Sequence, residues 1–346
     1  MKAQFEQSRE VIHSPSEPGI PAHLEEFRKK IIAENPLSPE QIRFLGEVNF
    51  DLLKKIYADI ASRCGITSDK FNFIDRGNIV RGYHVSQYDP ETNLVFIQDP
   101  NQRIEDGGRS NETYDQSVLH EYGAIGYRQL HTLIHEEGHS VSRNVAVVAD
   151  VIFPPRDPFS GEEEDKKDRK VTLPIFIQSG CMVSYREAFY QGKHSVDNAT
   201  NYIKDGKPIK KYNGMSALNE GITEKLSREV MLRYLDELGT DSADVQRIKD
   251  TFQKNKAESL SYAHEVNMIE RIIDKLASKN GQTKKVAWEA FVHAYFSGET
   301  FEEEDIGQLF SETFGPEFLK DLSKYWGGFM DKQSPSIHSF YSKYGL

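Results

Sequence analysis

Cysteine is scarce in this sequence. Two of its 346 residues are cysteines, Cys64 and Cys181, and neither lies in a CxxC pair. Two isolated thiols do not make a disulfide framework, which excludes the class of small secreted domains that disulfides hold together. We therefore expect both thiols to be free, as they are in a reducing compartment.

Long apolar runs are also missing. The opening residues, MKAQFEQSRE, contain no apolar core of the kind that a signal peptide needs. No stretch of about 18 apolar residues occurs elsewhere, so no membrane span is predicted. We expect a cytoplasmic protein, with export by a route that needs no signal peptide as the alternative.

Positive charge is in deficit. Lysine and arginine number 43 against 54 aspartates and glutamates, which gives a net charge of −11. This balance argues against nucleic acid or an anionic membrane surface as a partner. The content of 38% hydrophobic and 28% charged residues is that of an ordinary globular protein, and the chain is long enough for one large domain or two closely packed ones. Nothing in the sequence indicates the oligomeric state.

The most informative segment that is present is LHTLIHEEGHSV, residues 130–141, whose apolar residues recur at helical spacing and predict a buried helix. His135 and His139 lie four residues apart, on one face of that helix, where two ring nitrogens can hold one zinc ion. Glu136 stands beside the first histidine, where it can act as a general base on a metal-bound water. The segment therefore predicts two metal ligands and a catalytic base. The alternative is a helix with two histidines on a polar face.

A third ligand is expected further along the chain, because catalytic zinc sites usually have three protein ligands. Residues 216–226 predict a second amphipathic helix, with Glu220 and Glu224 four residues apart on one side. Glu220 is the candidate third ligand. Glu224 can accept a hydrogen bond from the other ring nitrogen of a ligand histidine and so fix its orientation. His131, one turn before His135, is too far along the axis to join the same ligands.

The segment HEEGH followed by NEGITE resembles the gluzincin group of zinc metallopeptidases. The resemblance implies that His135, His139 and Glu220 bind one zinc ion, that Glu136 is the general base, and that Glu224 supports a ligand histidine. It also implies a peptide or protein substrate and an α+β, zincin-like fold, with a mixed sheet and the HExxH helix above a mainly helical C-terminal subdomain. An endopeptidase is favoured, because no element resembling the GxMEN segment of related aminopeptidases occurs.

Two other functions remain open at this point. A protein of this kind can retain the zinc site as a non-catalytic regulator or sensor, although an intact glutamate base argues against that. An exported effector that cleaves one host protein is the other.

The interval between the two motifs is unusually long. His139 and Glu220 are 81 positions apart, whereas compact gluzincins place the glutamate soon after the histidines. Toxin-type members and the proline-specific secreted endopeptidases have longer intervals and carry a tyrosine shortly before the glutamate, which Tyr212 matches. The tetrahedral oxyanion of peptide hydrolysis needs a hydrogen-bond donor. The candidates for that donor are Tyr212, Tyr262 and His264.

Composition and spacing suggest four regions. Residues 1–22, rich in proline near their end, read as a flexible leader; residues 23–144 as an N-terminal helical and αβ part with an edge hairpin and the HExxH helix. Residues 145–211 are expected to form a β-rich insertion, and residues 212–346 a helical subdomain that contains the third ligand.

Two finer expectations concern the N-terminal part. Ser38-Pro39-Glu40-Gln41 predicts a helix start, with the helix running to about Arg63. Residues 83–88 and 93–98 predict a β-hairpin. In peptidases of this type the strand before the motif helix commonly edges the cleft and pairs with substrate, and residues 93–98 are the candidate for it. A purely structural hairpin is the alternative.

Overall fold

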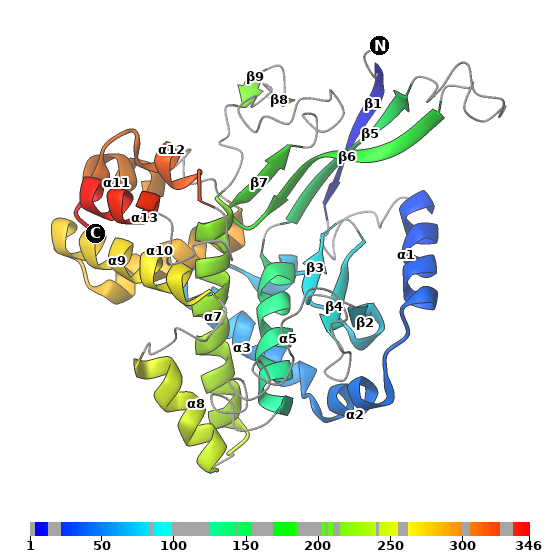
Figure 1. Cartoon of the computed structure of the whole chain (residues 1–346), viewed down its shortest axis with the longest axis horizontal. Helices are drawn as coiled ribbons and strands as arrows, with labels where there is room; N and C mark the ends of the chain where they lie inside the picture. Colours follow the sequence, from blue (N-terminus) through cyan, green and yellow to red (C-terminus); the bar gives the residue numbers. More distant parts are fainter. Residues whose placement is uncertain are drawn as a thin grey trace.

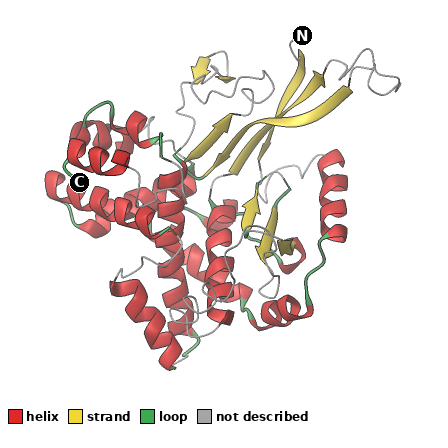
Figure 2. Ribbon diagram, in the orientation of Figure 1, coloured by secondary structure: helices red, strands yellow, loops and turns green. Residues whose placement is uncertain are grey.

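The computed structural model describes residues 4–12, 22–82, 86–90, 92–98, 125–142, 144–153, 169–185, 202–204, 207–209, 215–239, 242–254, 262–298, 305–325 and 335–346. These residues form an α+β structure in which helices predominate (Figures 1 and 2). A small mixed sheet and an antiparallel sheet accompany them. None of the helices in these ranges combines the length and the apolar character needed to cross a membrane.

Three helices follow one another near the N-terminus: α1 (Ala22–Glu34), α2 (Pro39–Glu47) and α3 (Phe50–Arg63). The predicted helix start is confirmed, because the side chains of Ser38 and Gln41 form a reciprocal capping box. The single helix expected to run to Arg63 is instead two helices. The helix is interrupted at Val48 and Asn49. The side chain of Asn49 accepts a hydrogen bond from the backbone N–H of Leu52 and caps the start of α3.

The mixed sheet contains β2 (Ile79–Gly82), β3 (Gln87–Asp89) and β4 (Leu94–Gln98), in the order β2-β4-β3. The short 3-10 turns Ser68–Lys70 and Arg76–Asn78 precede it. The expected hairpin is present as β3 and β4, which pair antiparallel, while residues 83–85 lie outside the described part.

The candidate substrate-pairing strand, residues 93–98, was wrongly placed at an edge. β4 is the central strand, because β2 pairs with it in parallel on one side and β3 on the other. A strand with both neighbours in place has no free backbone groups for a further strand. β3 is the edge strand next to the HEEGH helix.

The HEEGH helix α5 (Ile125–Val141) and the helix α7 (Ser216–Glu237) pack side by side at the centre of the molecule (Figure 1). Both helices were predicted from apolar spacing and are confirmed. Gly138 faces α7: a Cβ atom there would lie 3.0 Å from the Thr223 methyl group. Gly221 faces α9 (Ala263–Asn280), where a Cβ atom would lie 2.8 Å from the backbone oxygen of Glu265. The two glycines thus allow three helices to approach closely.

A four-stranded antiparallel sheet comes from the long interval between the motifs and from the N-terminus. It comprises β1 (Gln4–Ile12), β5 (Asn144–Phe153), β6 (Arg169–Ser179) and β7 (Met182–Tyr185), in the order β1-β5-β6-β7. The β structure expected within residues 145–211 is present in β5, β6 and β7. The strands β8 (Tyr202–Lys204) and β9 (Lys207–Ile209) form a separate pair.

The N-terminal segment differs from expectation. Residues 1–22 read as a flexible leader, yet residues 4–12 form β1 and pair antiparallel with β5. The prolines that gave the segment its leader-like composition stand at positions 15, 18 and 21, after the strand. Without β1, β5 would present an unpaired sheet edge, so the pairing satisfies backbone groups of both strands.

The described residues from 215 to the C-terminus are mainly helical, as predicted. Beyond α7 and α9 it contains α8 (Ala243–Lys254), α10 (Lys284–Ser297), α11 (Asp305–Phe314), α12 (Phe318–Leu322) and α13 (Pro335–Tyr344). Four glycines follow helix ends with positive φ angles, which glycine adopts at little cost: Gly239, Gly281, Gly298 and Gly315.

Candidate metal centre

Three side chains from two helices converge on one point. Nε2 of His135 lies 3.2 Å from Oε2 of Glu220, and Nε2 of His139 lies 3.3 Å from the same oxygen. The two ring nitrogens are themselves 3.2 Å apart. The histidines are buried and Glu220 is largely so. His135, His139 and Glu220 therefore form a cluster that can hold a metal ion.

The spacing of these three atoms fits a tetrahedral ion. Bonds of about 2.0 to 2.1 Å at a tetrahedral angle separate two ligand atoms by about 3.3 Å. In the structure the three separations are 3.2, 3.2 and 3.3 Å. Lone pairs of two ring nitrogens and a carboxylate oxygen repel one another at such distances unless a cation or protons lie among them. The donor set and its geometry thus fit one metal ion with a coordination position to spare.

The other ring nitrogen of His135 faces Glu224. Its Nδ1 lies 3.2 Å from Oε2 of Glu224, as the spacing of the two glutamates on α7 predicted. An Nδ1–H that donates to this carboxylate leaves the lone pair of Nε2 directed at the cluster. Burial lowers the pKa of His135, but hydrogen bonds to Glu220 and Glu224 raise it to about 10 in the absence of a metal.

The other ring nitrogen of His139 faces a hydroxyl network that the sequence did not reveal. Oγ1 of Thr223 lies 3.4 Å from Nδ1 of His139 and 2.7 Å from the hydroxyl of Tyr295. Tyr295, in α10, donates in turn to the backbone oxygen of Gly138. Thr223 belongs to the NEGITE segment, whereas no pattern pointed to Tyr295, 156 positions beyond His139.

The turn between β6 and β7 also reaches this side of the centre. The backbone N–H of Cys181 donates to Oδ1 of Asn219, whose amide nitrogen lies 3.4 Å from Nδ1 of His139. Gly180 has a φ of +56°, and a Cβ atom there would overlap the ring of Tyr295. The antiparallel sheet is thereby tied to the helix that carries Glu220. Cys181 is a free, buried thiol, as expected.

Glu136, the candidate base, is held by the edge strand of the mixed sheet. The backbone N–H of Tyr88 in β3 donates a 2.7 Å hydrogen bond to Oε2 of Glu136. Burial raises the pKa of Glu136, while the neighbouring His135 and His139 act in the opposite direction. A carboxylate with a raised pKa beside a metal cluster is suited to accept a proton near neutral pH.

Glu137 has a different role. Its carboxylate accepts from the backbone N–H of Ile74, in the segment between the two 3-10 turns, and burial raises its pKa to about 8. Tyr57, from α3, donates to the backbone oxygen of Ile134. These contacts hold α5 against the N-terminal half of the protein.

Negative charge exceeds positive charge around the cluster. Glu136, Glu220 and Glu224 are three carboxylates within or beside it, and Arg228 contacts one of them, Glu224. Because isolated charges are costly to bury, this excess favours a bound cation.

Two of the three candidate oxyanion donors, Tyr262 and His264, lie among the described residues. The ring of Tyr262 stacks on that of His135, with centroids 5.1 Å apart and an interplanar angle of 8°. Tyr262 caps α9 in a left-handed conformation, with φ of +57°. His264 is half-buried in the first turn of α9, and among the described residues no hydrogen bond or ring contact joins it to the three ligands. Tyr212 lies outside the described residues.

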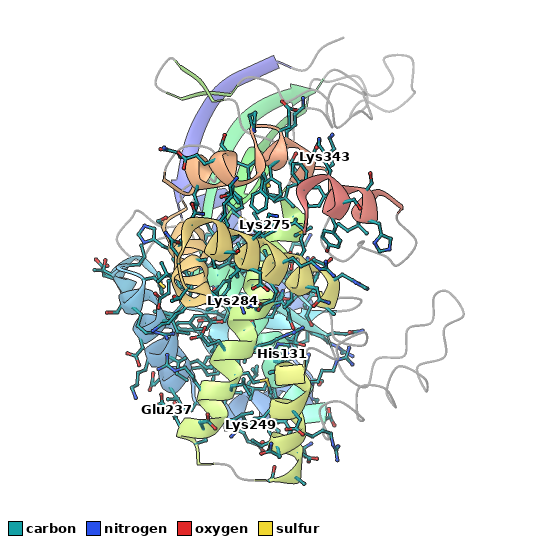
Figure 3. The ribbon with its side chains drawn as sticks, turned by 90° about the vertical axis from the view of Figure 1, so that its left-hand side faces the viewer. His131, Glu237, Lys249, Lys275, Lys284 and Lys343 are labelled. Atoms are coloured by element: carbon teal, nitrogen blue, oxygen red, sulfur yellow. The ribbon has the colours of Figure 1, made fainter. Side chains whose placement is uncertain are left out.

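His131, labelled in Figure 3, does not join the cluster. Its Nε2 lies 3.5 Å from Oε1 of Glu224, and its ring packs on Phe252 of α8 with centroids 5.1 Å apart. The expectation that it is too far along α5 to be a ligand is consistent with this position.

Comparisons with known proteins add no neighbour: no protein-family model matches this chain, and neither a curated protein nor a solved structure matches it. The functional interpretation therefore rests on the geometry of the site.

Proposed function

We propose that this protein is a zinc-dependent metallopeptidase with a zincin-like fold, and that it acts as an endopeptidase. The observation that carries the proposal is the meeting of His135, His139 and Glu220 within 3.3 Å of one another, with Glu136 adjacent on the same helix. Two imidazoles and one carboxylate are a ligand set of catalytic zinc, which retains an open position for water. A purely structural site usually has four protein ligands and needs no base.

Zinc bound at this cluster would supply Lewis acidity and lower the pKa of bound water toward neutrality. Glu136 would then accept the proton of the attacking water and pass it to the leaving amine. Since Tyr88 occupies Oε2 of this carboxylate, we assign the proton transfer to Oε1. Of the two candidate donors that the structure describes, Tyr262 is better placed for the oxyanion than His264, because its ring lies on that of His135.

The test combines metal content with hydrolysis of a peptide library. We expect about one zinc ion per chain in the wild-type protein, and cleavage of internal bonds in some peptides. Glu136→Gln should retain zinc and lose hydrolysis. Glu220→Ala should lose zinc and activity together, whereas Glu237→Ala, an exposed glutamate on the same helix that pairs with Lys55, should lose neither.

Three outcomes contradict parts of the proposal. Unchanged zinc content in Glu220→Ala would reject the third ligand. Full activity in Glu136→Gln would reject the base. Zinc binding with no cleavage of any peptide would favour a non-catalytic zinc-binding protein instead.

A further inference from the structure

The two oxygens of Glu224 have different partners. Oε2 faces Nδ1 of His135 at 3.2 Å, and Oε1 accepts a 2.8 Å hydrogen bond from Nε of Arg228. Nε2 of His131 lies 3.5 Å from the same Oε1. The carboxylate therefore bridges a histidine of the metal cluster and an arginine one helical turn further along α7.

These groups form a ladder between two antiparallel helices. On α5, His139, His135 and His131 follow at intervals of four residues; on α7, Glu220, Glu224 and Arg228 do the same. His139 meets Glu220, His135 meets both glutamates, and His131 meets Glu224. Side chains four residues apart share one helical face. The six side chains therefore form a continuous row of polar groups between the two helices, from the metal cluster to Arg228.

Arg228 lies at the end of this row that is further from the metal cluster. Its side chain is 7% exposed and that of Glu224 is 1% exposed. The guanidinium lies over the ring of Phe252 at 5.6 Å, and the same ring packs on His131. A carboxylate this deeply buried needs a counter-charge with good geometry, since removing one partner leaves an uncompensated charge.

We propose that Arg228 is a positioning residue of the metal centre, which acts through Glu224 to hold the ring of His135 in its ligating orientation. The inference rests on the proposed metal centre. With Oε1 bound to Arg228, the carboxylate plane is fixed, and Oε2 is presented to Nδ1 of His135. Without Arg228 the carboxylate can turn away from the ring, and His135 loses the partner that directs its Nε2 at the ion.

The first part of the test measures Zn²⁺ affinity by competition with a chromogenic chelator. Supporting partners of metal ligands typically contribute about 10 to 100-fold in affinity. We expect Arg228→Met to weaken Zn²⁺ binding at least about tenfold and Arg228→Lys to recover most of the loss. Arg233→Met is the matched control on the same helix, since Arg233 pairs with Asp59 near the surface, and its affinity should equal that of the wild type. The d–d absorption of the Co²⁺-loaded protein should change in Arg228→Met and should match that of the wild type in Arg233→Met.

The second part of the test removes the buried negative charge of Glu224, so that the result does not depend on the folding of Arg228→Met alone. Glu224→Gln is compared with the double variant Glu224→Gln/Arg228→Met. If Arg228 acts through Glu224, adding Arg228→Met to Glu224→Gln should change Zn²⁺ affinity by less than about threefold, because coupled residues give non-additive effects.

A loss of tenfold or more in both backgrounds would overturn the proposal, as would wild-type affinity in Arg228→Met. In either case the metal centre itself would stand. Failure of the wild-type protein to bind Zn²⁺ would instead reject the proposed function, and this inference with it.

Discussion

The backbone N–H of Tyr88 and the carboxylate of Glu136 are joined by a hydrogen bond of 2.7 Å. Because the N–H of Tyr88 donates to Glu136, it takes no part in the pairing of β3 with β4. The edge of β3 that carries this N–H therefore faces α5. Any extended peptide that paired with Tyr88 on this edge would compete with Glu136 for the same donor. The edge strand is thus directly coupled to the candidate base.

The hydrogen bond between Tyr88 and Glu136 should contribute to the free energy of unfolding. We expect Glu136→Gln to leave the free energy of unfolding nearly unchanged, because the amide oxygen of glutamine still accepts from Tyr88. Glu136→Ala should lower the free energy of unfolding by about 1 to 3 kcal/mol, the cost of leaving a buried N–H without an acceptor. Chemical denaturation of the two variants in chelator makes the comparison. Equal stabilities would show that the hydrogen bond contributes nothing to the fold.

The close approach of α7 and α9 at Gly221 gives a second prediction. Gly221→Ala places a methyl group 2.8 Å from the backbone oxygen of Glu265, so the helices must separate. We expect the free energy of unfolding to fall by about 1 to 3 kcal/mol and Zn²⁺ binding to weaken, because Glu220 is the preceding residue.

Gly126→Ala is the control for that variant. Gly126 is also helical, in α5, and a Cβ atom there has nothing within 4 Å. Alanine should therefore stabilise the helix by up to about 1 kcal/mol. Stabilisation by both substitutions would contradict the steric role of Gly221.

The buried His131 should make stability depend on pH. Burial lowers its pKa to about 4, although Glu224 acts in the opposite direction. In the unfolded chain the pKa of a histidine is about 6.5. Between these values the unfolded state binds more protons, so this residue makes the folded state progressively less stable as the pH falls from about 6.5 to about 4, by up to about 3 kcal/mol.

Urea denaturation of the metal-free protein at several pH values checks this dependence. His131→Leu should lose less stability than the wild type between neutral pH and pH of about 4, because it removes the group that takes up a proton on unfolding. His338→Leu, at an exposed position in α13, should behave as the wild type does. Identical pH dependence in wild type and His131→Leu would reject the prediction.

The parts of the fold that were predicted from the sequence are local ones. The helix start at Ser38 and Gln41, the helix around His135, and the helix that contains Glu220 all follow from residues within about one or two turns of each other. The expectation of a flexible leader was wrong for residues 4–12. The three prolines that suggested it stand after residue 12, and the strand β1 is stabilised by pairing with β5, which lies more than 130 positions away.

Long-range partners of the site were equally beyond a sequence pattern. Tyr295, which connects Thr223 to Gly138, comes from α10, and Tyr88, which binds Glu136, comes from β3. Neither residue is spaced relative to the motifs in a way that predicts contact, because the backbone between them is free to take many paths before it folds.

The sequence by itself identified the candidate ligands and the candidate base. His135 and His139 are four residues apart, as are Glu220 and Glu224, which sets each pair on one helical face, and Glu136 stands beside His135. Only the tertiary structure decided that the two pairs face each other. The reason is steric and electrostatic: glycines at 138 and 221 let α5, α7 and α9 approach closely, and Arg228 supplies the charge that allows Glu224 to be buried beside His135.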